Sequence, residues 1–404
     1  MMAFAPSIYW PVDRAWPRER AAPPPAWEAQ GNRYLAKRAL GFEHAGSGSL
    51  TLVVPVLKND SATQTRVLEP AREPNQTATQ QPLQTAAQIT IVAAEFGPDG
   101  RCRKSGKESM DKGGSSRTAI VTAMLRGAHY ILDGEPKILD DSFARAFAGF
   151  PSDEELLKRL NALAYPDFPR MRTLFALRNR YAEDELVRTI EHGTSQYIIL
   201  GAGLDSFAYR RPDLLRTLDV YEVDHPASQA WKRERVKELG IEIPARLHYV
   251  PIDFERETLT EGLAAGGINL LNVATFFSWL GVTQYLSSSA VLGTLREIAG
   301  LATPGSEIVF QFVVPAATLA GEESSLVTAL AAGAAAVGEP WLSFFEPEEL
   351  EAHLRQMGFG KVLHFGPLQA TERYLLGRTD GLRLPAYFHM IDACVGQGAT
   401  DIDR

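Results

Sequence analysis

The chain has 404 residues, 45% of them hydrophobic, which predicts a globular protein of two or three units. Its formal net charge of −8 at pH 7 argues against a nucleic-acid-binding face, because phosphate recognition requires clustered lysine and arginine. Only Cys102 and Cys394 are present, so neither a disulfide framework nor a metal site is expected, and this cysteine usage fits a reducing cytoplasm.

No membrane-spanning or secretory segment is predicted. Pro6 and Pro11 interrupt the apolar run near the first residue, and few basic residues accompany it. The longest charge-free apolar tract, 324–338, is shorter than the roughly 18 residues needed to cross a bilayer. We therefore expect a cytoplasmic protein that acts on a small molecule, with no membrane or nucleic-acid partner. The oligomeric state is not predicted.

Residues 1–110 differ in composition from the rest of the chain. They contain a proline-rich stretch at 21–27 and a Gln/Thr-rich tract at 75–88. Such segments bury little apolar surface, which is typical of a disordered extension. Apolar stretches at 50–57 and 89–96 are the candidate strands within it.

Residues 111–195 are predicted to be helical, because their apolar residues recur at helical spacing. The predicted helices cover 116–131, 141–150, 152–164 and 168–192. Ser152 and Glu155 have the spacing of a capping box at the start of the third helix. Since these helices precede the first strand of the predicted sheet, we expect them to form a cap over its carboxyl edge.

Residues 196–380 alternate between strand and helix patterns, which predicts an α/β fold with a doubly wound, mostly parallel sheet. Predicted strands lie at 197–200, 219–223, 246–253, 270–280 and 307–314, and predicted helices at 226–240, 255–265, 288–302 and 346–357. A helical insertion is expected at 316–337. Two last strands, at 361–365 and 373–377, are expected to pair antiparallel, and 381–404 to form a loose tail.

A glycine turn follows the first of these strands. Gly201, Ala202 and Gly203 open the pattern G-x-G-x-x-S, and acids follow about 20 residues later, at Glu222 and Asp224. Small residues let the backbone approach a ligand, and an acid at the end of the next strand can accept hydrogen bonds from ribose hydroxyls. The pattern suits dehydrogenases and methyltransferases almost equally, and a tight turn that needs positive φ would also explain the glycines.

Asp205 lies within the turn and favours one of these ligands. A pyrophosphate would be repelled by this carboxylate, whereas a ligand carrying an ammonium and a sulfonium would be attracted. The sequence therefore favours S-adenosylmethionine over a dinucleotide at Asp205.

Asp253 and Phe254 follow the third strand, at the same predicted edge of the sheet. Asp253 is placed to accept a hydrogen bond from an adenine amino group, and Phe254 to pack on the ring. Asp253 is an equally good candidate for the N-cap of the helix expected to start near Glu255.

Taken together, seven motifs resemble the leucine carboxyl methyltransferase-like class of S-adenosylmethionine-dependent methyltransferases, in particular its bacterial branch of O-methyltransferases. The resemblance covers about 116–377, and its motifs are SSRTA at 115–119, ILDDSFA at 138–144, RNRYAEDEL at 178–186, QYIILGAGLDSFAYR at 196–210, YEVDHPASQAWKR at 221–233, VPIDF at 250–254 and WLGVTQYL at 279–286.

This resemblance implies the Rossmann-like sheet of class I methyltransferases, with a helical cap and an insertion, and S-adenosylmethionine as the cofactor. It also implies which residues bind the cofactor. Gly201, Ala202 and Gly203 would lie under its methionine part, and Arg180, or as second choice Arg178, would bind the methionine carboxylate with assistance from Arg117. Asp224, or alternatively Glu222, would bind the ribose, and Asp253 with Phe254 would bind the adenine. The chain departs from many members at Leu280, where they have an acid. Tyr285 matches an aromatic residue of the same motif.

The implied reaction is methyl transfer to an oxygen of a small molecule. A carboxylate acceptor would need no base, whereas a hydroxyl acceptor would. His129, His225 and His248 are the candidate bases, but a structural or surface role explains each of them better, so no catalytic residue is assigned. An NAD(P)-dependent oxidoreductase and a non-catalytic cofactor-binding member of the family are the alternatives.

Overall fold

The computed structural model of the protein describes residues 95–96, 102–103, 117–163, 167–254, 256–336 and 338–396. Strands β1 (Glu95–Phe96) and β2 (Cys102–Arg103) pair antiparallel. Apart from these two strands, the extension expected over 1–110, with its candidate strand at 50–57, lies outside the described residues.

The expected helices that precede the sheet are present, although their lengths differ from expectation. Their bounds are α2 (Arg117–Leu132), α3 (Ala144–Phe147), α4 (Asp153–Leu163) and α5 (Phe168–Glu191). Helix α3 is shorter than the predicted 141–150. Asp141 lies before it, where its carboxylate accepts the Ala144 N–H at 3.0 Å and pairs with Arg126 at 2.8 Å. Ser152 accepts the N–H of Glu155 at the start of α4, at 3.3 Å.

A seven-stranded sheet forms the centre of the fold, in the order β5-β4-β3-β6-β7-β9-β8. The strands are β3 (Gln196–Leu200), β4 (Asp219–Asp224), β5 (Leu247–Pro251), β6 (Thr275–Trp279), β7 (Glu307–Val313), β8 (Phe359–Phe365) and β9 (Phe388–Val395). Only β9 runs antiparallel to its neighbours in this sheet. This topology confirms the predicted fold class of a doubly wound, mostly parallel methyltransferase sheet.

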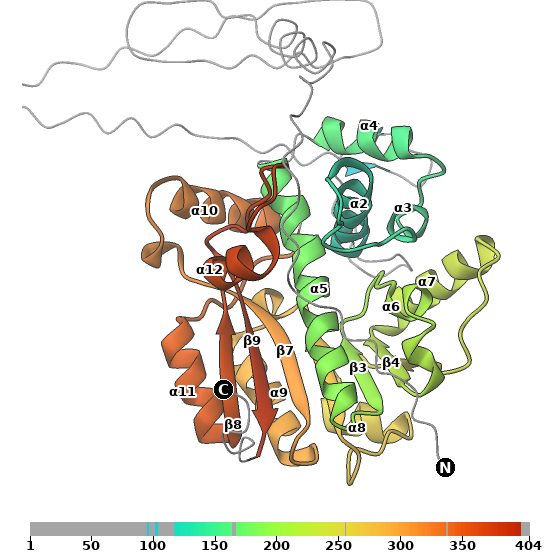
Figure 1. The fold of residues 1–404 in the computed structure, drawn as a ribbon, viewed down its shortest axis with the longest axis vertical. Coiled ribbons are helices and arrows are strands. Elements are labelled where there is room, and N and C mark those ends of the chain that lie inside the picture. The colour runs from blue at the N-terminus through green and yellow to red at the C-terminus, as the bar shows by residue number, and fades with distance from the viewer. Residues whose placement is uncertain are drawn as a thin grey trace, which may run out of the picture. The chain divides into compact units, whose positions relative to one another are not determined.

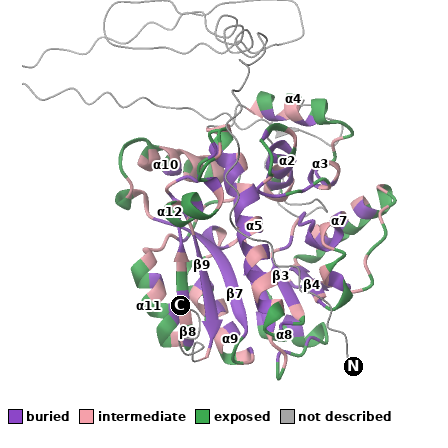
Figure 2. Ribbon diagram, in the orientation of Figure 1, coloured by how far each residue is buried: buried purple, intermediate pink, exposed green. Residues whose placement is uncertain are grey.

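Helices cover the sheet and its carboxyl edge (Figure 1). The connections between strands carry α6 (Phe207–Arg210), α7 (Pro226–Glu238), α8 (Leu259–Ala265), α9 (Ser288–Leu301), α10 (Gly321–Ala336), α11 (Pro347–Met357) and α12 (Pro367–Ala370). Helix α5 packs on β6, β7 and β9, whereas α9 lies beside α8 and α11. Helices α2, α3, α4 and α10 lie at the end of the sheet where the parallel strands finish. Figure 2 shows that the central strands are almost wholly buried.

Two expectations for the last part of the chain are wrong. Residues Thr371–Leu375 form a π-helical segment instead of a strand at 373–377, and β8 pairs with β9. The tail expected at 381–404 instead contains β9, which lies between β7 and β8. Its strand pattern is obscured by Asp392, a charged residue that is 1% exposed and lies 3.4 Å from Arg188 on α5.

Asp392 makes the stability of the fold depend on pH. Burial, together with the nearby carboxylates of Glu307 and Glu185, raises the pKa of Asp392 well above its usual range. The folded state therefore retains a proton that the unfolded state loses above about pH 4, and stability falls as the pH rises from there toward the folded pKa.

We expect Asp392→Asn to remove this part of the pH dependence. The variant should lose less stability than the wild type between pH 5 and pH 8, by about 1.4 kcal/mol for each pH unit of this range that lies below the folded pKa of Asp392. Urea denaturation of both proteins at the two pH values measures the difference. Equal losses would show that Asp392 is ionised throughout this range.

Candidate functional site

The glycine turn after β3 is held by its own backbone and by two neighbouring segments. Gly201 and Gly203 have φ of +67° and +48°, a region that favours glycine. A Cβ at Gly201 would overlap Val282, which follows β6, and a Cβ at Gly203 would lie 3.2 Å from Ala119 in the first turn of α2. Ala202 donates its N–H to Val223 on β4 at 3.1 Å. Backbone conformation and packing therefore both require these glycines.

Asp205 is engaged inside the protein rather than open to the site. Its carboxylate accepts the N–H of Phe207 at 2.7 Å, which fixes the start of α6, and the side-chain amide of Asn179 on α5 at 3.0 Å. Asp205 therefore links the glycine turn to α5, and its carboxylate points into the protein interior.

The two acids of β4 have different surroundings. Glu222 is fully buried, and Lys232 of α7 lies 2.6 Å from its carboxylate and also donates to the Asp205 carbonyl at 2.6 Å. Burial raises the pKa of Glu222 to about 7. This ion pair joins α7 to the sheet and engages one oxygen, Oε2, of the carboxylate that was the alternative ribose-binding acid.

Asp224 ends β4 at the carboxyl edge and joins two turns. Its carboxylate accepts the backbone N–H groups of Gly203 and, at 2.7 Å, of His225. Burial raises the pKa of Asp224, and the two backbone hydrogen bonds act in the opposite direction. Because a carboxylate has about four acceptor positions, Asp224 can still accept hydrogen bonds from hydroxyl groups.

Asp253 and Phe254 lie at the end of the neighbouring strand, β5, whose residue Pro251 is paired with Asp224. Helix α8 starts only at Leu259, with Thr258 and Glu261 forming its capping box. The alternative role of Asp253 as N-cap of this helix is therefore wrong. Phe254 is 45% exposed, so its ring can pack against a planar group.

The two candidate arginines of α5 point to different places. The side chain of Arg180 is 43% exposed and pairs with Asp184 at 2.8 Å. Arg178 is only 6% exposed, and a Cβ at Gly281, after β6, would overlap its guanidinium. Arg178 thus lies at the carboxyl edge beside the glycine turn, whereas Arg180 lines a groove with residues 138–140, 142–143, 183–184 and 209–212.

Arg178 has no carboxylate partner among the described residues. Its Nη1 donates to the Gln311 side-chain oxygen at 3.1 Å, its guanidinium stacks on Phe175 at 4.5 Å, and its Nε has no partner within the described structure. Burial lowers the pKa of Arg178 to about 9. A buried cation with only neutral partners is costly, which makes this position suited to an anionic ligand.

The helical periodicity of buried residues along α5 places Arg178 and Arg180 on different faces of the helix. Leu174, Arg178 and Tyr181 are all buried and follow one face of α5 at spacings of four and three residues. Arg180 is two positions from Arg178 and therefore points to another side of the helix. Arg117 begins α2, two residues before Ala119, and is exposed.

The segment after β6 contributes polar groups that the sequence did not single out. Leu280 is half-buried and packs on the core. Beyond it lies the short helix η2 (Thr283–Tyr285), in which Gln284 is buried and its side-chain oxygen has no partner within the described residues. Tyr285 lies near enough to Arg178 to influence its pKa.

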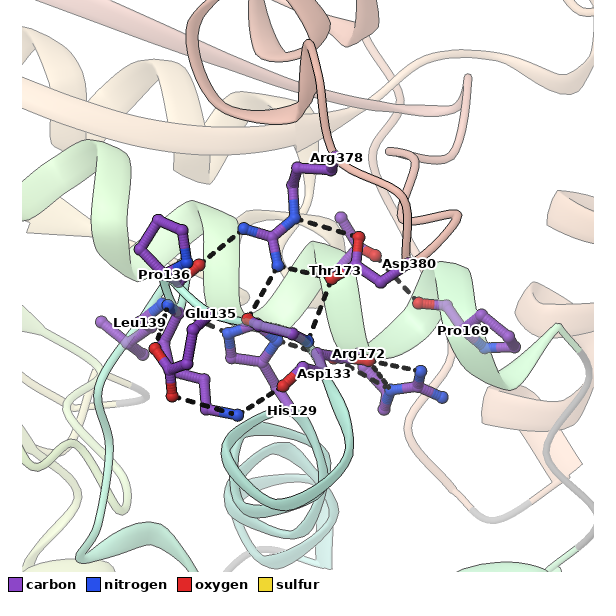
Figure 3. Close-up of polar contacts among 12 residues, drawn as sticks. His129, Asp133, Glu135, Pro136, Leu139, Pro169, Arg172, Thr173, Arg378 and Asp380 are labelled. Atoms are coloured by element: carbon purple, nitrogen blue, oxygen red, sulfur yellow. Dashed lines mark hydrogen bonds and ion pairs between the residues drawn. The ribbon is translucent and has the colours of Figure 1, made fainter. Parts of the chain in front are cut away.

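None of the three candidate bases is free at this edge. His129 is enclosed by Asp133 at 2.7 Å and by the Leu139 N–H at 3.2 Å, in the network drawn in Figure 3. His225 caps α7 by accepting the Ala227 N–H at 3.2 Å. His248 stacks on Tyr221 near the amino end of β5.

Figure 3 also shows why His129 is inaccessible. Asp133, which bonds to His129, pairs with Arg172 of α5 at 2.6 Å. Arg378 donates to the carbonyls of Gly134 and Pro136, at 3.0 and 2.6 Å. These bonds join α2, α5 and the segment before β9 into one network that surrounds the imidazole.

Two kinds of feature are absent from the described residues. No helix there is both long and apolar enough to span a bilayer. No group of three or more His, Cys, Asp or Glu side chains in that part of the chain could hold a metal ion.

Known proteins resemble this chain over most of the described region. Residues 119–299 match the model of the leucine carboxyl methyltransferase family. The protein named "Putative S-adenosyl-L-methionine-dependent methyltransferase YktD" from Bacillus subtilis is 31% identical over 304 residues, covering 70% of this chain and 99% of YktD. Franean1_4929 of Parafrankia sp., with the same designation, is 33% identical over 207 residues, which cover 49% of this chain and 63% of that protein.

Among solved structures, that of a DUF574 family protein from Streptomyces avermitilis has 16% sequence identity to this chain. The match covers 70% of this chain and 98% of the Streptomyces protein chain. Its TM-score is 0.45.

We can test whether Glu222, unlike Asp224, has a structural role, by removing its partner Lys232. Lys232→Met should lower the free energy of unfolding by about 3 kcal/mol or more at pH 8, because Glu222 would be left buried without its cation. At pH 5 the loss should be smaller, since a protonated Glu222 needs no counter-ion. Urea denaturation measures both values.

The matched control is Lys237→Met on the same helix, because Lys237 is exposed and pairs with Glu234 at 3.2 Å. That change should have little effect. Combining Glu222→Gln with Lys232→Met should recover most of the loss. Equal stability of the Lys232 and Lys237 variants would contradict the structural role of the ion pair.

Proposed function

The chain belongs to the leucine carboxyl methyltransferase family and is an S-adenosylmethionine-dependent methyltransferase, and from this premise we propose that it methylates a carboxylate oxygen of a small molecule. It is therefore an enzyme of methyl transfer rather than the oxidoreductase that the glycine pattern also allowed. The observation that carries the choice of a carboxylate is that His129 is enclosed by Asp133, His225 uses its Nδ1 to cap α7, and His248 stacks on Tyr221. A carboxylate is ionised at neutral pH and needs no base.

The residues present fit the cofactor, and Arg178 is the main support. Its buried guanidinium has one neutral hydrogen-bond partner and a free Nε among the described residues. A methionine carboxylate would supply the missing negative charge through charge-assisted hydrogen bonds. We therefore assign the cofactor carboxylate to Arg178 in preference to Arg180, with Arg117 remaining a candidate at the start of α2.

The other cofactor groups follow along the same edge of the sheet. Strands β6, β3, β4 and β5 are consecutive neighbours, and three strand spacings amount to about 14 Å. Arg178 lies over the first of these strands, Asp224 ends the third, and Asp253 and Phe254 follow the fourth. We assign Asp224 to the ribose and Asp253 with Phe254 to the adenine, while Glu222 and Asp205 support the turn from beneath.

The chain's part in the reaction is positioning. The bound cofactor supplies an activated methyl group on a sulfonium. The residues around the glycine turn hold this group at the carboxyl edge, so that an acceptor oxygen can approach the methyl carbon in line with the bond that breaks, and they exclude water. No proton has to be removed from a carboxylate acceptor, so no side chain is required as a base.

We assign the acceptor side to the cap (α2 to α4) and to the insertion that contains α10. One contact joins the cap to the glycine turn, and another joins the cap to the insertion. Ala119 of α2 packs on Gly203, and the hydroxyl of Thr118 donates to the carboxylate of Glu339, just after α10. The cap and the insertion thus meet over the edge at which the methyl group would lie.

The affinity for S-adenosylhomocysteine tests whether Arg178 or Arg180 binds the cofactor carboxylate. Arg178→Met should weaken binding about 10- to 100-fold, because charge-assisted hydrogen bonds contribute about 1.5–3 kcal/mol. Arg180→Met, the matched control, should change the affinity less than twofold. Calorimetry on both purified variants, with a thermal melt to confirm that each is folded, gives the comparison. A large loss in Arg180→Met alone would reverse our assignment.

The bond formed distinguishes a carboxylate from a hydroxyl acceptor. We expect that the protein, incubated with methyl-labelled S-adenosylmethionine and a bacterial metabolite extract, produces label that alkali releases as methanol, because methyl esters hydrolyse and methyl ethers do not. Label that survives alkali would contradict carboxylate methylation while leaving methyltransferase activity intact.

A further inference from the structure

Two buried polar groups on segments near the glycine turn lack hydrogen-bond partners among the described residues. One is the side-chain oxygen of Gln284, a residue only 6% exposed, and the other is the indole N–H of Trp341. Most buried polar atoms in native proteins are paired, and a lost pair costs about 1–3 kcal/mol. Two such groups on adjoining segments therefore indicate a site that binds a polar ligand.

The segments that carry them are hydrogen-bonded to one another. Leu342, which follows Trp341, donates its N–H to the Gln284 carbonyl at 2.6 Å. Ser343 donates its hydroxyl to the Thr283 carbonyl at 2.8 Å. The backbones that bear the two side chains are therefore fixed relative to each other, as a pre-organised binding site requires.

The place of these segments connects them with the transferred methyl group. Helix η2, which contains Gln284, follows Gly281 and Val282 after β6. Gly281 abuts the Arg178 guanidinium, and Val282 abuts Gly201 of the glycine turn. Gln284 is therefore two residues beyond the wall of the proposed methionine site, at the edge where an acceptor must approach.

The chemistry of the two groups suits a carboxylate. The indole N–H is a donor only, and the glutamine amide can present its NH₂ group after a half-turn about its last bond. Two neutral donors can orient a carboxylate without forming an ion pair with it. An oxygen held in this way keeps more of its nucleophilicity than one bound by a guanidinium.

We propose that Gln284 and Trp341 form the acceptor subsite and bind the carboxylate of a small organic acid with an apolar body. This inference rests on the proposed function. The apolar part is suggested by Phe344, whose ring centroid lies 6.4 Å from that of Trp341, and by Phe345, both half-buried. Gln284 and Trp341 act as specificity-determining residues.

The step they support is balanced without a base. A carboxylate oxygen gives an electron pair to the methyl carbon, and the bond between that carbon and sulfur breaks with its pair remaining on sulfur. A carboxylate and a sulfonium become a neutral ester and a neutral thioether. No proton moves and no oxidant or reductant is needed.

The test uses full-length protein, methyl-labelled S-adenosylmethionine and an acid fraction of a bacterial metabolite extract as the acceptor. Gln284→Leu and Trp341→Phe should each raise the amount of this fraction needed for half-maximal rate about tenfold or more. Their affinity for S-adenosylhomocysteine should stay within twofold of the wild type. The control Leu342→Ala, at a side chain that is 56% exposed on the same segment, should change neither quantity.

A fourth variant tests the class of acceptor. Gln284→Glu places a negative charge in the subsite, so it should reduce turnover more than Gln284→Leu if the acceptor is a carboxylate. A hydroxyl acceptor would instead be tolerated, because it can donate to the new carboxylate, and that result would overturn the proposal.

Other outcomes also decide against the subsite. Unchanged half-saturation in both Gln284→Leu and Trp341→Phe would mean that ordered water satisfies these groups. An equal loss of S-adenosylhomocysteine binding would assign them to the cofactor instead. Failure of the wild type to bind S-adenosylhomocysteine would instead refute the cofactor assignment on which the subsite rests.

Discussion

The buried charge of Arg178 is the constraint on which the site depends. A guanidinium in this position requires Gly281 beside it, because any side chain there would overlap it, and it requires the amide oxygen of Gln311 as a neutral partner. These contacts tie α5 to the ends of β6 and β7. They satisfy the hydrogen bonds of the arginine only in part, and no carboxylate among the described residues pairs directly with its guanidinium, so an anion at this edge would complete the arrangement. The cofactor carboxylate is the anion that the family's chemistry provides.

The acids on β4 illustrate how one strand serves both the fold and the site. Glu222 and Asp224 are two residues apart and therefore face the same side of the sheet. Glu222 lies within the strand and reaches Lys232 of the covering helix, so its charge is neutralised inside the protein. Asp224 lies at the end of the strand, where backbone N–H groups of two turns bind it and where a ligand can reach it. The position along the strand, rather than the residue type, separates the structural acid from the proposed binding acid.

Local patterns were sufficient to predict the parallel sheet and the glycine turn, because β3, β4 and their connection are specified by short apolar runs and by glycines whose positive φ the structure bears out. They failed where a long-range contact overrides local preference. Strand β9 was missed because Asp392 interrupts its apolar run, and the Asp392 side chain contacts Arg188 on α5, which is distant in the sequence. Motif matching selected Arg180 as the anchor, although the burial pattern of α5 favours Arg178. The pairing of Gln284 with the backbone of Leu342 could not be predicted, because 58 residues separate them in the sequence.

The central claim is that Arg178 and Asp224 hold the two polar ends of the cofactor's aminoacyl-ribose part at the carboxyl edge. A crystal structure of the protein with S-adenosylhomocysteine tests it most directly. We expect the methionine carboxylate within about 3 Å of the Arg178 guanidinium, the ribose hydroxyls at Asp224 and the adenine against Phe254. A complex in which Arg180 binds the carboxylate, or in which the ribose hydroxyls lie away from Asp224, would contradict it.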